Sequence, residues 1–356
     1  MNPAIAWLVA AAVVVPGFDA AVVVSGFDRA VVVSGFDTAV VVSGFSRTVY
    51  AQAPTPPPLP TDATATAIPG VVAEGAKVQL LASGLQGTEG PIAAPDGTFL
   101  FTEQNANRIT RIDAQGRVTP YLSNSNGTLG LAYDARGRLI AAQGTNPQIA
   151  VLSPTRDVLA DSFEGMPLLR PNDLVVDGRG GIYFTDPGPI PQPGQMLNLP
   201  RKPAVLYIRP EGGVIRIAED IVIPNGLVLS PDGKILYVAD SRAETLLAFD
   251  VQPDGTVKNR RTFGLLQGLE KSPDGFRGSA DGITVDSEGR VYAATRAGVQ
   301  VISPQGRHLG TIPTGIAAGP QNLAFVGPDR KTLFIVGRGA AWKVPMLSQG
   351  VAGRSK

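Results

Sequence analysis

The chain has 356 residues with 31 basic and 30 acidic side chains, a net charge of +1, and 6% aromatic residues. Nucleic-acid binding needs clustered basic side chains and stacking rings, so this balance argues against a nucleic-acid partner. The absence of cysteine excludes disulfides and thiolate metal sites. The 42 glycines and 31 prolines fall mostly at regular intervals between short apolar runs, which is typical of an all-β repeat protein.

The N-terminal segment predicts export. Residues 5–15 form an apolar run that is too short to span a bilayer but suits the core of a signal peptide. A nine-residue repeat follows: AVVVPGFDA, AVVVSGFDR, AVVVSGFDT, AVVVSGFSR. Charged residues interrupt this repeat before any apolar span reaches about 18 residues, so we expect no stable membrane span in the mature protein.

The end of this segment resembles a cleavage site, with Val49 and Ala51 at the positions where small residues are required. We therefore predict that residues 1–51 are a signal peptide lengthened by duplication and that the mature protein is periplasmic or secreted. A mistaken start site is the alternative. The valine triplets are β-prone and could pair with one another if they are retained. Residues 52–74 are rich in proline and predict an extended linker.

Within residues 75–348, one sequence pattern of two strands joined by a turn occurs six times. A start residue opens an apolar strand, a turn follows, and a second strand ends in a polar residue. The start residues are Glu89, Leu129, Asn172, Asn225, Asp281 and Asn322. In five copies a glycine stands eight residues after the start, where a hairpin needs positive φ, and Arg330 takes that place in the sixth.

Repeats of about 40–50 residues with several strands each are typical of a β-propeller, so we predict a six-bladed β-propeller. The segment from Lys77 to Ala82 precedes the first repeat. We expect it to add the outermost strand to the sixth blade and so close the ring. A β-sandwich is the competing all-β fold, but it does not predict six similar units.

Because the first strand of each blade lines the central channel, equivalent start positions should face one another across it. Five of the six starts carry a side-chain oxygen, which suits Ca²⁺, whereas zinc or copper would call for His or Cys. The alternative is that Asn and Asp only initiate turns. A turn would favour one residue type, and Glu89 is a poor turn former, so we favour a metal ion in the central channel.

Four motifs resemble the gluconolactonase and senescence-marker-protein (regucalcin-like) family: TEGP at Glu89, RPNDLVVD at Asn172, IPNGLVLSPDG at Asn225 and SADGITVD at Asp281. The resemblance implies that these four residues surround one divalent cation, usually calcium. The chain departs from the family's second-blade NGL motif, because Leu129 occupies the position of its asparagine. Either Asn124 and Asn126 substitute for it in substrate binding, or that quadrant of the site is apolar.

The resemblance also implies hydrolysis of a small lactone. A cation would polarise the carbonyl group, and a carboxylate would accept the proton of the attacking water. Asp281 is the candidate general base, with Glu89 second. Asp186 and Asp240, at the ends of second strands, are expected to bind substrate hydroxyls. Asn322 has two equally supported roles, contact with a metal-bound water or a structural one.

The proline-rich insertion after Asp186 is expected to lie over the pocket as a lid. Three other functions compete with the lactonase: a related metal-dependent esterase or phosphotriesterase, a non-catalytic ligand-binding propeller, and a quinone-dependent sugar dehydrogenase. The dehydrogenase would need a histidine at its cofactor site. His308 is expected between outer strands of the fifth blade, which is badly placed for that role. No GxSxG motif supports a serine hydrolase.

Overall fold

The computed structural model describes residues 58–189 and 198–353, together with the backbone of four N-terminal strands. The chain divides into two compact units, Met1–Pro58 and Leu59–Lys356. Among the residues described, none belongs to a helix long and apolar enough to cross a membrane.

The first unit contains an antiparallel sheet of four strands, which lie side by side in the order in which they occur in the chain. Its strands are β1 (Val22–Ser25), β2 (Ala30–Val33), β3 (Thr38–Ser43) and β4 (Arg47–Gln52). In the register of this sheet, Val23 is paired with Val32 and Val41 is paired with Val49. β-branched residues favour strands because they pack well on a pleated surface. The predicted apolar core of the signal peptide lies outside the described residues, and export stays a prediction.

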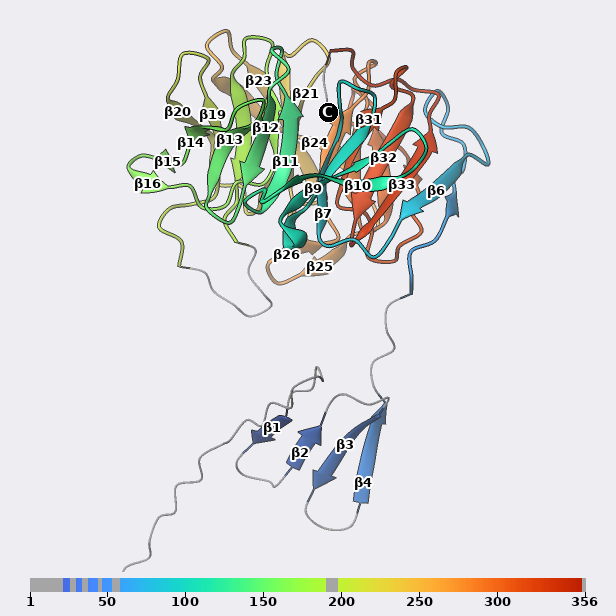
Figure 1. Ribbon diagram of the computed structural model, residues 1–356. Coiled ribbons are helices and arrows are strands. Elements are labelled where there is room, and N and C mark those ends of the chain that lie inside the picture. Colours follow the sequence, from blue (N-terminus) through green and yellow to red (C-terminus); the bar gives the residue numbers. More distant parts are fainter. Residues whose placement is uncertain are drawn as a thin grey trace, which may run out of the picture. The chain divides into compact units, whose positions relative to one another are not determined.

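The second unit consists of six antiparallel sheets (Figure 1). The first sheet contains β7 (Thr88–Ala93), β8 (Phe99–Glu103), β9 (Arg108–Ile112) and β10 (Val118–Ser123). The second contains β11 (Thr128–Tyr133), β12 (Leu139–Gln143), β13 (Gln148–Ser153) and β14 (Asp157–Ala160). The third contains β17 (Leu174–Val176), β18 (Ile182–Asp186), β19 (Ala204–Ile208) and β20 (Val214–Ala218).

The remaining three sheets follow the same plan. The fourth contains β21 (Pro224–Leu229), β22 (Ile235–Asp240), β23 (Thr245–Val251) and β24 (Val257–Leu265). The fifth contains β27 (Ile283–Val285), β28 (Val291–Thr295), β29 (Gly298–Ile302) and β30 (His308–Ile312). The sixth contains β31 (Asn322–Val326), β32 (Thr332–Gly337), β33 (Ala340–Pro345), β6 (Lys77–Ala82) and β5 (Ala63–Thr64). The connecting loops add a 3₁₀ turn (Gln104–Ala106) and two hairpins, β15 (Ser162–Phe163) with β16 (Met166–Pro167) and β25 (Glu270–Ser272) with β26 (Gly275–Arg277).

The first strands of the blades form a closed ring. They contact one another in the order β7, β11, β17, β21, β27, β31, and β31 contacts β7. Buried apolar clusters fill the space between each pair of adjacent blades. The predicted six-bladed β-propeller is therefore confirmed, and its core consists of layers between blades.

Glycine lets neighbouring first strands approach closely around the axis. A Cβ atom on Gly226 would lie 2.5 Å from the carbonyl oxygen of Asp281 in the next blade. The amide of Gly226 donates to that same oxygen at 2.9 Å, which links the two blades. At the predicted hairpin position, Gly97 has φ of 81° and Arg330, its counterpart in the sixth blade, has φ of 52°. The left-handed turn is thus present even where the glycine is absent.

Ring closure is also confirmed, but β6 is not the outermost strand of the sixth blade, because the two-residue strand β5 pairs with its other edge. β6 pairs antiparallel with β33, with Leu80 opposite Trp342. The predicted linker, residues 52–74, differs from the structure in its second half. Ile68 and Val72 are buried against the fifth and sixth blades, and Trp342 Nε1 donates to the carbonyl of Thr61 at 2.8 Å. The apolar side chains of ATAIPGVV account for this difference, because they cover the outer strands of these two blades.

Candidate functional site

A cavity of about 280 Å³ opens where the first strands begin. Every blade contributes to its wall, so the cavity lies at the mouth of the central channel. Its lining residues are Glu89, Gln104, Leu129, Arg170, Asn172, Pro189, Asn225, Asp281 and Gln321. The four residues predicted to hold a cation, which lie far apart in the chain, are therefore brought together.

Glu89 lies at the start of β7 and is almost fully buried. Its Oε1 accepts a hydrogen bond from Gln321 Nε2 at 3.0 Å, and its Oε2 accepts one from Asn322 Nδ2 at 3.2 Å. Burial, together with the nearby negative charge of Asp281, raises the pKa of Glu89 from 4.5 to about 8, and the Asn322 hydrogen bond opposes this shift. Burial and the neighbouring carboxylate of Asp281 therefore both disfavour the charged form of Glu89.

Asn225 presents an unpartnered oxygen. Its Nδ2 donates to Ser241 Oγ at 3.1 Å, and Ser241 Oγ donates to the carbonyl of Ala280 at 2.9 Å. This hydrogen-bond network fixes the orientation of the amide. Asn225 Oδ1 is buried and has no hydrogen-bond partner. A buried carbonyl oxygen without a partner is costly, and a bound cation would satisfy it.

Asn172 and Asp281 are held through their backbones. Asn172 N donates to Thr185 O at 3.0 Å, and Asp281 N donates to Ala294 O at 2.9 Å. The four residues together offer two carboxylates and two amides, which suits a hard divalent cation such as Ca²⁺. Within residues 58–189 and 198–353, no three His, Cys, Asp or Glu side chains cluster in a way that could hold a metal ion. Any cation site here thus depends on the amides.

Arg170, which was not predicted from the sequence, is the basic side chain of the cavity wall. Its Nη2 donates to Gln104 Oε1 at 2.9 Å. Burial lowers the pKa of the Arg170 guanidinium, and the charge of Glu89 opposes this effect. Arg170 stands two residues before Asn172 in the RPND motif, and this proximity to a predicted ligand was the signal that could have found it. Gln104 and Gln321 were missed as well, because they lie outside the repeat template.

Asp186 and Asp240 do not line the cavity, contrary to the expectation that they bind substrate hydroxyls. The carboxylate of Asp186 is fully buried, accepts hydrogen bonds from the amides of Leu169 at 2.9 Å and Arg170 at 2.7 Å, and pairs with Arg201. Asp240 similarly accepts from the backbone amides of the loop before β21, at 3.1 Å each. Both carboxylates turn toward the loop that enters the first strand. They therefore position the residues that line the cavity.

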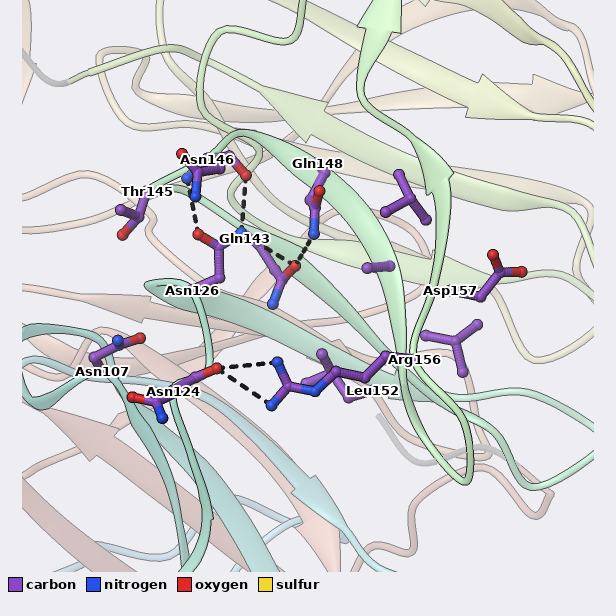
Figure 2. A pocket seen from close by; sticks show the side chains of 13 residues that line it. Asn107, Asn124, Asn126, Gln143, Thr145, Asn146, Gln148, Leu152, Arg156 and Asp157 are labelled. Carbon is purple, nitrogen blue, oxygen red and sulfur yellow. Dashed lines mark hydrogen bonds between the residues drawn. The ribbon is translucent and has the colours of Figure 1, made fainter.

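Asn124 and Asn126 lie in a different cavity, of about 730 Å³, against the outer strands of the second blade (Figure 2). Asn126 Nδ2 donates to Asn146 O, and its Oδ1 accepts from Asn146 N, both at 2.9 Å. The central cavity shares no lining residue with this one, and Leu129 faces the central cavity in the second blade. Of the two alternatives, the structure favours the apolar quadrant.

Asn322 lies behind Glu89 and is buried. Its Nδ2 donates to Glu89, and its Oδ1 accepts from the amide of Leu323 at 2.9 Å. This placement favours the structural one of its two predicted roles. Of the insertion that was predicted as a lid, Pro189 lines the cavity, whereas residues 190–197 lie outside the described residues.

Several known proteins resemble this chain in sequence and fold. Residues 87–338 match the family model described as SMP-30/Gluconolactonase/LRE-like region. A gluconolactonase of Zymomonas mobilis is 28% identical over 286 residues, which cover 72% of this chain and 78% of the relative. The solved structure of a gluconolactonase from Xanthomonas campestris superposes with a TM-score of 0.69 at 27% identity, covering 83% of this chain and 99% of that one. A calcium-binding regucalcin from Agrobacterium tumefaciens shares the fold, with a TM-score of 0.61 at 19% identity over 77% of this chain and 95% of that chain.

Proposed function

Because the chain belongs to the SMP-30/gluconolactonase/LRE-like family, we propose that it hydrolyses small lactones in the cavity at the mouth of its central channel. One observation carries the proposal: the buried, unpartnered Asn225 Oδ1 shares this cavity with Glu89, Asn172 and Asp281. The names of the gluconolactonase relatives support the choice of a lactone as substrate.

Glu89, Asn172, Asn225 and Asp281 would hold a divalent cation, and their all-oxygen donor set favours Ca²⁺. When bound, the cation supplies a Lewis acid that polarises the lactone carbonyl and stabilises the negative charge that develops on its oxygen. Gln321 and Asn322 orient Glu89, and Ser241 orients the amide of Asn225. Such supporting hydrogen bonds keep the donor atoms in place before the substrate arrives.

Asp281 is the proposed general base, with Glu89 as the second candidate. As water attacks the carbonyl carbon, Asp281 accepts the proton that the water loses. The bond between the carbonyl carbon and the ring oxygen then breaks, and Asp281 returns the proton to the departing oxygen. The product is an open-chain hydroxy acid.

The lactonase proposal is tested by titrating acid release from a panel of lactones, with and without a chelator. We expect about one bound calcium per chain and loss of activity on chelation. Asp281→Asn should lower kcat by about 10²- to 10⁴-fold. The control, Asp220→Asn, changes an exposed carboxylate that pairs with Lys202 and should leave kcat unchanged. A metal-free protein that retains full activity would contradict the cation site, and full turnover by Asp281→Asn would remove the base role.

We also propose that the protein is exported to the periplasm or outside the cell and that the mature chain begins near Gln52. The small residues at the predicted cleavage site and the preceding apolar run support this. Sequencing of the N-terminus of the native protein should give a start near Gln52. Recovery of intact Met1 from the cytoplasm would contradict the export proposal.

A further inference from the structure

The cavity of about 730 Å³ against the second blade, here called the second-blade cavity, has a wall rich in amide side chains (Figure 2). Its volume lies within the range of about 300–1,000 Å³ that small-molecule sites of proteins occupy. Both the first blade and the second blade contribute to the wall. Its amide residues are Asn107, Asn124, Asn126, Gln143, Asn146 and Gln148.

A buried hydrogen-bond network holds part of this wall in place. Gln143 is only 1% exposed, and its Nε2 donates to the carbonyl of Ser125 at 2.7 Å. Its Oε1 accepts from Gln148 Nε2 at 2.6 Å and from Asn126 Nδ2 at 3.3 Å. The amide of Asn126 is also bonded on both sides to the backbone of Asn146. Amides that are oriented in this way lose little conformational freedom when they bind a ligand.

Other polar atoms of the same wall are left for a ligand. Within residues 58–189 and 198–353, four of the amide residues keep side-chain atoms that form no hydrogen bond. These atoms are Gln148 Oε1, Asn107 Nδ2 and both polar atoms of Asn124 and Asn146. Amides place donors and acceptors side by side, so a suitable ligand carries groups that both donate and accept, as hydroxyl groups do.

The charge of the wall favours a neutral ligand. Its charged residues are one arginine and one aspartate, Arg156 and Asp157. The Arg156 guanidinium is directed to the backbone, because its Nη1 and Nη2 donate to the carbonyl of Asn124 at 3.2 and 3.3 Å. The remaining charge of the wall therefore sums to zero.

The rest of the wall is apolar and aliphatic. Among the described residues that line the cavity there is no aromatic ring, so a nucleobase would find no stacking surface. Aliphatic side chains suit the C–H faces of sugar rings, which alternate with the hydroxyl groups of the same rings. These side chains are Ala150, Val151, Leu152 and Val158.

We propose that the second-blade cavity is a non-catalytic binding site for a neutral disaccharide or trisaccharide. Sugar hydroxyls would pair with the free amide atoms, and the ring carbons would contact the aliphatic side chains. The size of the ligand follows from the two cavities, since about 730 Å³ here compares with about 280 Å³ where a single lactone ring is proposed to bind. The proposal does not depend on the lactonase function.

Calorimetric titration with maltose, cellobiose and trehalose tests the site, and at least one of them should bind saturably. Gln148→Met keeps the length of the side chain and removes its free acceptor. Asn146→Ala removes an exposed amide, while the backbone bonds to Asn126 remain. Each change should weaken binding about 3- to 10-fold, which corresponds to the loss of a hydrogen bond. Gln115→Met, on the exposed turn between β9 and β10, is the matched control and should bind like the native protein.

The absence of saturable binding by all three sugars would overturn the proposal, and so would native affinity in both cavity variants. Thermal unfolding of each variant shows whether it is folded, and if Gln148→Met unfolds, Asn146→Ala decides alone. Trehalose 6-phosphate should bind no more tightly than trehalose. Tighter binding of the phosphate that is lost in Arg156→Met would make this an anion site and contradict the proposal.

A change in the central cavity shows where the sugar binds. Asp281→Asn lies outside the second-blade cavity and should keep the native affinity for the sugar. Loss of sugar binding in this variant would place the ligand in the central cavity and overturn the second site. A protein that binds the sugar but hydrolyses no lactone would refute the lactonase function alone.

Discussion

Glu89 and Asn225 differ in the hydrogen bonding of their side-chain oxygens. Both Glu89 oxygens accept hydrogen bonds from neutral amides, which orient the carboxylate. Asn225 keeps its Nδ2 bonded to Ser241 while its Oδ1 is left without a partner. Negative charge and unpartnered oxygen are both destabilising in a buried cavity, and the proposed divalent cation would relieve both.

Because the pKa of Glu89 is raised, the stability of the cation-free protein should depend on pH. The pKa of Glu89 is raised from 4.5 to about 8 in the folded state, so the folded chain holds more protons than the unfolded chain between these pH values. The contribution of Glu89 to the free energy of unfolding should therefore decrease as pH rises from 4.5 to about 8. Urea unfolding in the presence of chelator measures this dependence.

Glu89→Gln is the matched variant for this measurement, because it keeps the size of the side chain and removes its titration. The stability of the native chain should approach that of the variant at the acidic end of the range and fall below it at the alkaline end. Parallel stability curves for the two proteins would show that the carboxylate is not desolvated as described.

Single residues also mark the limit of what could be predicted from the sequence. The repeat template located Glu89, Asn172, Asn225 and Asp281, since equivalent starts must meet at the axis. It could not show that Asp186 and Asp240 turn toward backbone amides, because the period fixes the strand on which a side chain lies but not the loop that it faces. Arg170 was missed for the same reason, because it lies on a loop whose course depends on Asp186.

Among the elements, the first strands of neighbouring blades lie close together around the central cavity. Their neighbouring backbones approach so closely that several positions beside a start residue have room only for glycine. The hydrogen bonds from Gly226 to Asp281 O and from Gly282 to Gln321 O connect consecutive blades. The residues proposed to bind a cation are thus carried by strands whose backbones approach closely.

Gly226→Ala tests this tight packing. The added methyl group would lie 2.5 Å from Asp281 O and 2.6 Å from Ile283 N, so the two first strands must move apart. We expect the free energy of unfolding to fall by about 1–3 kcal/mol, with weaker cation binding. Gly178→Ala is the control, because no atom lies within 4 Å of the place that its methyl group would take. Equal stability of both variants in urea unfolding would show that the strands are not so closely packed.

For the whole molecule, the ring depends on residues from both ends of the propeller sequence. β6 lies before the first blade in the chain but pairs with β33 of the last. The six-fold repeat and the closing strand could be predicted, since both follow from periodicity. The packing of Ile68 and Val72 could not, because a proline-rich composition is typical of a linker and conceals short apolar stretches.

Two truncations test the closure of the ring. A chain that starts at Leu59 keeps β5 and β6 and should unfold in one cooperative transition like the full chain, since residues 1–58 form a separate unit. A chain that starts at Ser83 lacks both strands and leaves β33 as an unpaired edge. We expect the shorter chain to be markedly less stable and prone to aggregate. Calorimetry and light scattering measure the two effects, and equal behaviour of both chains would contradict the role of β6.

The pairing of β6 with β33 also bears on how the protein is made. β6 leaves the ribosome before any blade, but its partner is synthesised only after the other five blades. Long-range strand pairing is slow because the intervening chain must first be ordered. During synthesis β6 therefore lacks its partner β33 until the sixth blade is made, and a chaperone that binds extended chains could bind it throughout that time.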